Sequence, residues 1–205
     1  MNSIVNDKVD PPLLWSDRIQ KRKWWLFGII ALGIVLALFD RWRVWREDSQ
    51  DACIIAAARQ YNVDPALVKA VVWRESQFNP RVQGRAGEVG LMQLREAAAS
   101  EWAKAEKVAF YSHRQLFDPG KNTQAGTWYL RKLLARYTQT DNPIPYALAD
   151  YNAGRTHVLR WNKGAAATNS AVFLTQIDFP GTRKYIAEIM ARREKYRGKL
   201  KLTDT

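Results

Sequence analysis

The sequence predicts a mainly α-helical domain preceded by one transmembrane helix, and three observations support this fold class. Residues 24–39 read WWLFGIIALGIVLALF, an apolar run without a charge or a proline. After about residue 49, apolar residues recur at helical spacing, while the alternation typical of strands is scarce. Hydrophobic residues make up 47% of the 205 residues, which is enough for the core of one domain.

The apolar run is expected to cross a lipid bilayer. It is slightly shorter than the ~20 residues that a spanning helix needs, and its flanks make up the difference. A buried core helix would carry a polar face, which this run lacks. No small-residue cleavage site follows it, so a retained anchor is favoured over a removed signal peptide. Residues suited to the membrane–water interface stand on both sides: Lys21, Arg22, Lys23, Trp24, Trp25, Arg41, Trp42, Arg43 and Trp45.

The apolar run also divides the chain. Residues 1–20 are polar and contain two consecutive prolines, so they are expected to form a short cytoplasmic arm. Residues 21–45 are the transmembrane anchor with its flanks, and residues 46–205 are the folded domain. Because basic residues crowd both flanks, charge alone does not orient the helix in the membrane.

The charge of the chain is strongly basic. The formal net charge is +12, and residues 183–201 contain eight lysines or arginines against two glutamates. Such a tail suits nucleic acid, anionic lipid or an acidic polymer such as a bacterial cell wall, and it also suits a solvated helix face. No zinc finger, phosphate-binding glycine loop or RNA-binding aromatic motif is present, so nucleic acid is not expected as a partner. The single Cys53 excludes an internal disulfide.

The first two helices of the domain are expected over residues 49–61 and from Asp64 onward. Ser49 or Asp51 stands near the start of the first helix. Asp64 is a typical N-cap, and Pro65 fits the first helical position because its missing N–H has no partner there. A loop is expected over residues 83–90, which contain three glycines.

Four more helices are expected further along the chain. Helical composition resumes over residues 91–107 and again over residues 123–137. The two prolines at residues 143–145 are expected to break the chain before a short helix that Gly154 ends. The last helix is expected from about residue 182 to residue 197, with its apolar side chains facing inward.

Glu75 is the first candidate functional residue. Leu67, Val71 and Glu75 are spaced four residues apart and therefore share one face of their helix. A carboxylate at the edge of an apolar face loses solvation in its charged form, which raises its pKa. A raised pKa suits a general acid near neutral pH, although a glutamate at a helix end can also turn to solvent.

Four stretches give Glu75 a context: ESQFNP (75–80), GEVGLMQL (87–94), ALADYNAG (147–154) and TRKYI (182–186). A fifth, LFDPGKNTQAGTWYLRKLL (116–134), links the middle two. In this order and spacing, the sequence over about residues 50–195 resembles the lytic transglycosylase domain of the soluble-transglycosylase type, in the lysozyme-like superfamily. The resemblance implies a lysozyme-like helical fold.

The resemblance also implies roles for individual residues. Glu75 would be the single catalytic acid and base, placed at the end of its helix and facing a cleft. Six residues would shape the cleft or bind substrate: Ser76, Met92, Gln93, Tyr146, Tyr151 and Asn152. Within this set, Met92 and Gln93 would lie closest to the sugar. Tyr151 and Asn152 would orient Glu75 and the sugar acetamido group.

The implied chemistry uses one carboxylate, no metal and no cofactor. Glycosidases usually need two carboxylates, but a substrate with an N-acetyl group can supply the second nucleophile itself. Glu75 would first protonate the β-1,4 bond between N-acetylmuramic acid and N-acetylglucosamine in peptidoglycan. As a base, it would then take the proton from the muramoyl 6-hydroxyl, which closes a 1,6-anhydro ring.

Two departures from the family pattern leave alternatives open. Glu88 adds a carboxylate to the loop beside the site, where it could hold a water for hydrolysis, bind a peptide stem or face solvent. Gly181 stands where many relatives have a glutamate, so a sugar contact through that glutamate is absent. The alternative functions are a muramidase of the same fold and a wall-remodelling factor for a secretion or pilus apparatus.

The substrate would also fix the location of the domain. Peptidoglycan cleavage would place a single-pass protein in the inner membrane of a bacterial cell, with its amino terminus inside and its catalytic domain in the periplasm. The expected partners are peptidoglycan glycan strands, the lipid bilayer through residues 24–39, and cell-wall or secretion machinery.

Overall fold

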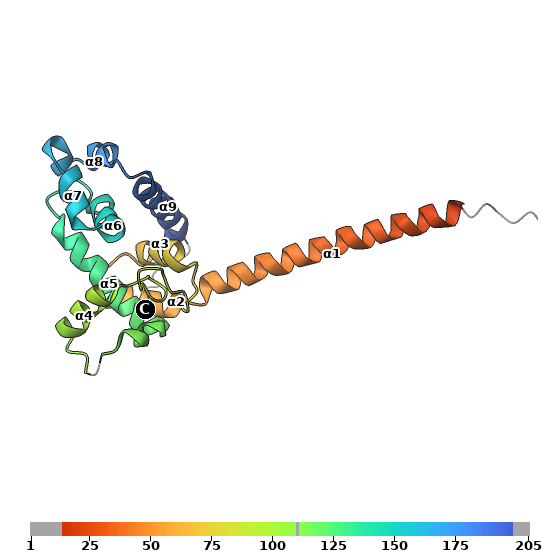
Figure 1. Ribbon diagram of the computed structural model, residues 1–205, viewed down its shortest axis with the longest axis horizontal. Coiled ribbons are helices and arrows are strands. Elements are labelled where there is room, and N and C mark those ends of the chain that lie inside the picture. The colour runs from red at the N-terminus through yellow and green to blue at the C-terminus, as the bar shows by residue number, and fades with distance from the viewer. Residues whose placement is uncertain (1–13, 110, 199–205) are drawn as a thin grey trace, which may run out of the picture. The chain divides into compact units, whose positions relative to one another are not determined.

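The structure of the protein, a computed structural model, describes residues 14–109 and 111–198, with side chains from residue 22 onward (Figure 1). The chain divides between Trp45 and Arg46 into two compact units. Most of the predicted cytoplasmic arm and the last basic residues of the tail lie outside the described residues.

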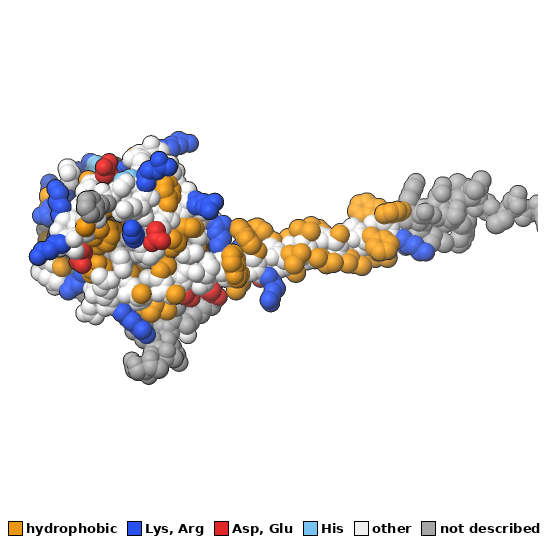
Figure 2. All heavy atoms as spheres, turned by 90° about the horizontal axis from the view of Figure 1, so that it is seen from below, with side chains coloured by type: hydrophobic (Ala, Val, Ile, Leu, Met, Phe, Trp, Pro, Cys, Tyr) orange, Lys and Arg blue, Asp and Glu red, His pale blue; other side chains and the backbone are white. Residues whose placement is uncertain are grey.

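The described part of the first unit is helix α1 (Leu14–Asp48) as far as Trp45, and the last residues of this helix belong to the second unit. Its 35 residues extend over about 50 Å at 1.5 Å per residue, more than the thickness of a bilayer core. The side chains from Trp24 to Phe39 are exposed, and Figure 2 shows hydrophobic side chains along the helix surface. Within the described residues, it is a helix long and apolar enough to cross a membrane.

The second unit is a bundle of helices. Its α-helices are α2 (Asp51–Gln60), α3 (Pro65–Ser76), α4 (Glu96–Ala105), α5 (Pro119–Arg136), α6 (Pro143–Ala153), α7 (Arg155–Trp161), α8 (Ser170–Gln176) and α9 (Pro180–Arg197). Two 3₁₀ helices, η1 (His113–Phe117) and η2 (Gly164–Ala167), connect them. The described residues contain isolated β-bridges but no strand, so the mainly α prediction is confirmed.

The helix starts follow the capping signals in the sequence. The Asp64 side chain accepts a hydrogen bond from the backbone N–H of Ala66, and Pro65 occupies the first turn, as predicted. Asp118 caps α5 in the same way, and this helix begins at Pro119, four residues before the predicted start. The prediction for residues 143–145 was wrong, because these prolines form the first turn of α6 under the cap of Asn142 and do not precede the helix.

Two other expectations need correction. Residues 91–95 do not open a helix, because Val89 and Leu94 exchange backbone hydrogen bonds and Gln93 has a φ of 47°. The helix of this region therefore begins at Glu96. Helices α7 and α8 were not predicted, since each has seven residues and is too short to show an apolar period.

The core forms around α3. Every residue from Ala66 to Val72 is buried, because α3 packs against α9 on one side and α2 on another (Figure 1). Lys69 is included in this buried stretch, and its charge is balanced by Asp48 at 3.1 Å and Asp51 at 2.6 Å. Helix α5 packs against α2, α4 and α6 and completes the core.

A buried amide fixes the turn over residues 89–92. The Asn122 side chain on α5 donates hydrogen bonds to the backbone oxygens of Val89 and Leu116, and it accepts one from the N–H of Met92. Gly90 lies directly against this amide with a φ of 77°, and a Cβ at this position would overlap Asn122 and the Leu116 carbonyl. Only glycine combines this φ with such a close approach.

Replacing Gly90 by alanine is predicted to destabilise the domain by about 3 kcal/mol or more, because backbone strain is added to overlap with a buried amide. Gly87→Ala is the matched control, since Gly87 has a φ of 83° and open space around it. The Gly87→Ala variant adds only backbone strain and should destabilise the domain by about 1 kcal/mol. Thermal unfolding of the full chain in detergent, followed by circular dichroism, measures both, and equal losses would contradict the close approach at Gly90.

Candidate active site

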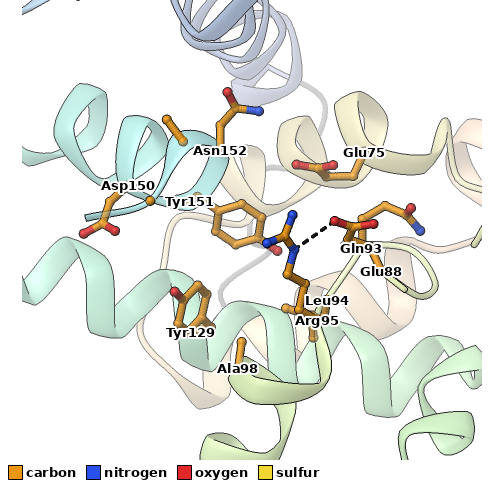
Figure 3. A pocket seen from close by; sticks show the side chains of 12 residues that line it. Glu75, Glu88, Gln93, Leu94, Arg95, Ala98, Tyr129, Asp150, Tyr151 and Asn152 are labelled. Carbon is orange, nitrogen blue, oxygen red and sulfur yellow. Dashed lines mark hydrogen bonds and ion pairs between the residues drawn. The ribbon is translucent and has the colours of Figure 1, made fainter. Parts of the chain in front are cut away.

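A cleft of about 400 Å³ lies beside the end of α3. Figure 3 shows the side chains that line it, which come from α3, the loop before α4, α4, α5 and α6. They are Glu75, Glu88, Gln93, Leu94, Arg95, Ala98, Tyr129, Asp150, Tyr151, Asn152, Ala153 and Gly154. The structure thus brings five of the predicted site residues to one cleft: Glu75, Glu88, Gln93, Tyr151 and Asn152.

Glu75 is placed in the last turn of α3 by the apolar face that it extends. Its Oε1 accepts a 2.6 Å hydrogen bond from the hydroxyl of Tyr185 on α9. Burial raises the pKa of Glu75 to about 7, although this hydrogen bond and the neighbouring Arg74 both favour the charged form. A carboxyl group with this pKa exchanges its proton near neutral pH, as a general acid or base requires.

Two tyrosine hydroxyls face this region from different helices. The Tyr151 hydroxyl on α6 donates a 2.7 Å hydrogen bond to the Met92 carbonyl, and its ring packs edge-on against Tyr129. Burial, together with the nearby charge of Glu75, raises the pKa of both Tyr151 and Tyr185 well above the usual value. Both therefore remain neutral hydrogen-bond donors across the physiological pH range.

The two amides of the cleft differ in freedom. Gln93 donates through Nε2 to the backbone oxygens of Val82 and Gly90, which fixes its side chain along the loop. Asn152 is exposed at the end of α6, and its Oδ1 accepts a 2.9 Å hydrogen bond from Thr182 on α9. The Nδ2 group of Asn152 makes no hydrogen bond to a described residue, so it can donate to a ligand.

Glu88 lies in the cleft wall and is held on both oxygens. Oε1 accepts from Arg95 Nε at 2.9 Å, the contact drawn in Figure 3, and Oε2 accepts from the N–H of Ala86 at 3.0 Å. The slight burial of Glu88 would raise its pKa, but the hydrogen bonds from its surroundings and the charge of Arg95 lower it overall. The carboxylate is therefore charged and already engaged.

Asp150 is the third carboxylate of the cleft, and it is nearly completely buried. It is paired with Arg136 and accepts a 2.7 Å hydrogen bond from the Tyr137 hydroxyl. Removing either partner would leave the other charge buried and unpaired, so Asp150 is committed to this pair between α5 and α6. Glu75 is the remaining carboxylate of the cleft, and no cation lies within ion-pair distance of it among the described residues.

Three predicted site residues do not line the cleft. Ser76 is buried, and its hydroxyl donates to the Val72 carbonyl, so it supports the helix end. Met92 packs its side chain against α5 in the core and contributes only its carbonyl to Tyr151. The assignment of Tyr146 to the cleft wall is corrected, because its ring stacks on Phe173 and its hydroxyl donates to Ala166 in the core.

Three residues of the site were missed in the sequence. Tyr185 lies in the TRKYI stretch, but it was counted among the inward-facing apolar side chains of the last helix. Only the tertiary fold brings its hydroxyl to Glu75. Arg95 and Tyr129 belong to helical patterns without any local signal of function. Among the described residues, no group of three or more His, Cys, Asp or Glu side chains is placed to hold a metal ion.

Comparison with known proteins identifies the family. The sequence model of the Transglycosylase SLT domain matches residues 52–174, more than half of the chain. The chain therefore belongs to this family, and the predicted lysozyme-like fold is confirmed. It aligns to the soluble lytic murein transglycosylase of Escherichia coli with 35% identity over 66% of this chain and 21% of that protein.

Two further similarities agree. Membrane-bound lytic murein transglycosylase C of Klebsiella pneumoniae is 38% identical over 51% of this chain and 31% of its own length. The structure of an inactive glutamate-to-glutamine mutant of lytic transglycosylase Slt from Pseudomonas aeruginosa superposes with a TM-score of 0.67 at 26% identity. That match covers 73% of this chain and 24% of the other. The chain thus spans less than a third of the length of each of these relatives.

The burial of Glu75 is predicted to cost stability increasingly as the pH rises from about 4.5 to about 7, and the full cost applies above that range. Because its folded pKa of about 7 lies above the ordinary value of 4.5, ionisation opposes folding once the pH rises through this window. Glu75→Gln should stabilise the domain at pH 8 by at most about 3 kcal/mol, and most of this gain should disappear at pH 5. Thermal unfolding at the two pH values measures the difference.

Glu106→Gln is the control for that experiment, because Glu106 is an exposed glutamate at the end of α4. It should change the midpoint little at either pH. A Glu75→Gln effect that is the same at pH 5 and pH 8 would contradict the raised pKa.

Proposed function

We propose that this protein is a peptidoglycan lytic transglycosylase that cleaves the β-1,4 bond between N-acetylmuramic acid and N-acetylglucosamine and leaves 1,6-anhydromuramoyl ends. The observation that carries the proposal is Glu75, a carboxyl group in a cleft with a pKa of about 7 and no cation paired with it among the described residues. Membership of the Transglycosylase SLT domain family supports the reaction class.

Glu75 acts first as an acid. The Tyr185 hydroxyl donates a hydrogen bond to Oε1, while Oε2 makes no hydrogen bond to a described residue. Oε2 is therefore the atom that would deliver the proton to the glycosidic oxygen. The desolvation that raises its pKa keeps a large fraction of the group protonated at neutral pH. The Tyr185 hydroxyl would hold the carboxyl group in place while Oε2 releases its proton.

Cleavage of the bond needs a nucleophile from the substrate itself, because the other two carboxylates of the cleft are already engaged. Glu88 is engaged by Arg95 and the Ala86 N–H, and Asp150 is paired with Arg136. The N-acetyl oxygen of the substrate would therefore support the developing charge at C1. Glu75, now ionised, would take the proton of the muramoyl 6-hydroxyl, and this route is favoured over a muramidase reaction with water held by Glu88.

Digestion of purified sacculi is expected to give muropeptides with anhydro ends, one water lighter than reducing ends. Glu75→Gln should reduce this product by a factor of about 10³ or more, because acid and base are the same group. Glu88→Gln is the matched control, and its products should still carry anhydro ends. Mass spectrometry of the products distinguishes the reactions, and reducing ends from the wild-type chain would establish a hydrolase.

Tyr185→Phe is predicted to shift the pH profile of kcat/KM. Wild-type activity should fall above about pH 7, where Glu75 loses its proton. Removing the Tyr185 hydroxyl removes a hydrogen bond that favours the charged form, so the pKa of Glu75 rises further and the alkaline limb moves upward by up to about one unit. We expect kcat to fall about tenfold because the carboxyl group is less well oriented.

Tyr151→Phe provides the comparison for that profile. The Tyr151 hydroxyl donates to the Met92 carbonyl and not to Glu75, so its removal should leave the alkaline limb near its wild-type position. Equal shifts in both variants would show that general disturbance of the cleft, rather than the Tyr185 hydrogen bond, moves the limb.

The proposal extends to location. The exposed apolar side chains of α1 would hold the protein in the inner membrane through residues 24–39, with the catalytic domain in the periplasm, where peptidoglycan lies. The membrane-bound relative in Klebsiella pneumoniae supports an anchored enzyme of this family. Protease protection of the domain in intact cells, and its loss when the outer membrane is permeabilised, would test this orientation.

A further inference from the structure

A guanidinium group lies in the cleft with most of its donors unused by the described residues. The Arg95 side chain is 68% exposed and meets Glu88 through Nε, while its two terminal nitrogens make no hydrogen bond to a described residue. Figure 3 shows the guanidinium among the cleft side chains, between Glu88 and Tyr151. This position is on the wall that a bound glycan would touch.

The backbone places Glu88 and Arg95 opposite each other. Val89 and Leu94 exchange both backbone hydrogen bonds in an isolated antiparallel bridge, so Glu88 and Arg95 are the next facing pair of residues. The Gly84 N–H donates to the Glu88 carbonyl at 2.7 Å. A Cβ at residue 84 would overlap Glu88 Oε2, so the carboxylate occupies space that a side chain at residue 84 would otherwise fill.

The pair adds little to the stability of the fold. An ion pair with a largely exposed arginine contributes about 0–1 kcal/mol. What the pair does fix is direction, because a carboxylate on Nε holds the plane of the guanidinium and leaves its terminal fork open. Such a fork binds a carboxylate through two parallel hydrogen bonds, which a lysine cannot reproduce.

We propose that Arg95, held by Glu88, is a specificity-determining residue that binds a carboxylate group of the glycan strand beside the cleaved bond. The inference rests on the proposed function, because it names a substrate group that the same cleft would bind. The sugar rings of peptidoglycan are neutral, so carboxylates come from two sources. One is the free lactyl group of muramic acid that lacks its peptide, and the other is the peptide stem.

The experiment compares kcat/KM of the full chain on matched strands. One pair consists of glycan strands stripped of peptides, with lactyl carboxylates either free or converted to primary amides. The second pair consists of peptide-bearing strands, with stem carboxylates either free or amidated. The wild-type chain is expected to prefer the free carboxylate by roughly tenfold in the pair whose carboxylate Arg95 binds.

Arg95→Gln should reduce that preference to about one, and Arg95→Lys should keep only part of it because the fork is lost. Arg114→Gln is the charge-matched control, since Arg114 is exposed on η1 outside the cleft, and it should retain the wild-type preference. The preference is a ratio within each variant, so partial loss of folded protein does not change it.

Two results would overturn the inference: no carboxylate preference of the wild-type chain in either pair, or a preference that Arg95→Gln leaves intact. Both would leave the proposed function standing, provided that anhydro products form. Failure of the proposed function has a different signature, the absence of anhydro ends with all four strands.

Discussion

The cleft depends on one buried amide more than on any other single interaction. Asn122 binds three backbone groups, the carbonyls of Val89 in the loop and Leu116 in η1 and the N–H of Met92. Because unsatisfied buried polar groups are costly, these bonds fix the loop against α5. The same turn then accepts the Tyr151 hydroxyl through the Met92 carbonyl, which joins α6 to it. The part of the cleft wall that this loop forms is therefore held by hydrogen bonds made in the core.

Glu75 depends on a second long-range contact, the packing of α3 against α9. This contact removes water from the carboxyl group and at the same time delivers the Tyr185 hydroxyl. Desolvation and the hydrogen bond act in opposite directions on the pKa, and desolvation is the larger effect. Helix α9 also supplies Thr182, which holds Asn152 at the cleft. Helix α9 thus positions both Glu75 and Asn152.

The sequence predicted well what depends on local pattern and poorly what depends on distant contacts. The cap of α3 and the buried face that leads to Glu75 follow from residues within one helix. The turn over residues 91–95 has a helical composition, yet bonds to Asn122, about 30 residues later, override it. Tyr185 lies 110 residues from Glu75, and Tyr146 stands beside a functional stretch but faces the core. The helical spacing of apolar residues does not show which of these two tyrosines faces the site.

A single carboxyl group that serves as acid and then as base has to be available in both forms. A pKa far above 7 would make Glu75 a good base but a reluctant acid, and an ordinary pKa near 4.5 would leave almost no protonated group at neutral pH. Burial acting alone would raise the pKa of Glu75 further. The Tyr185 hydrogen bond and the charge of Arg74 oppose that rise, while the charge of Glu88 adds to it. The balance of these effects with desolvation suits one residue to both proton transfers.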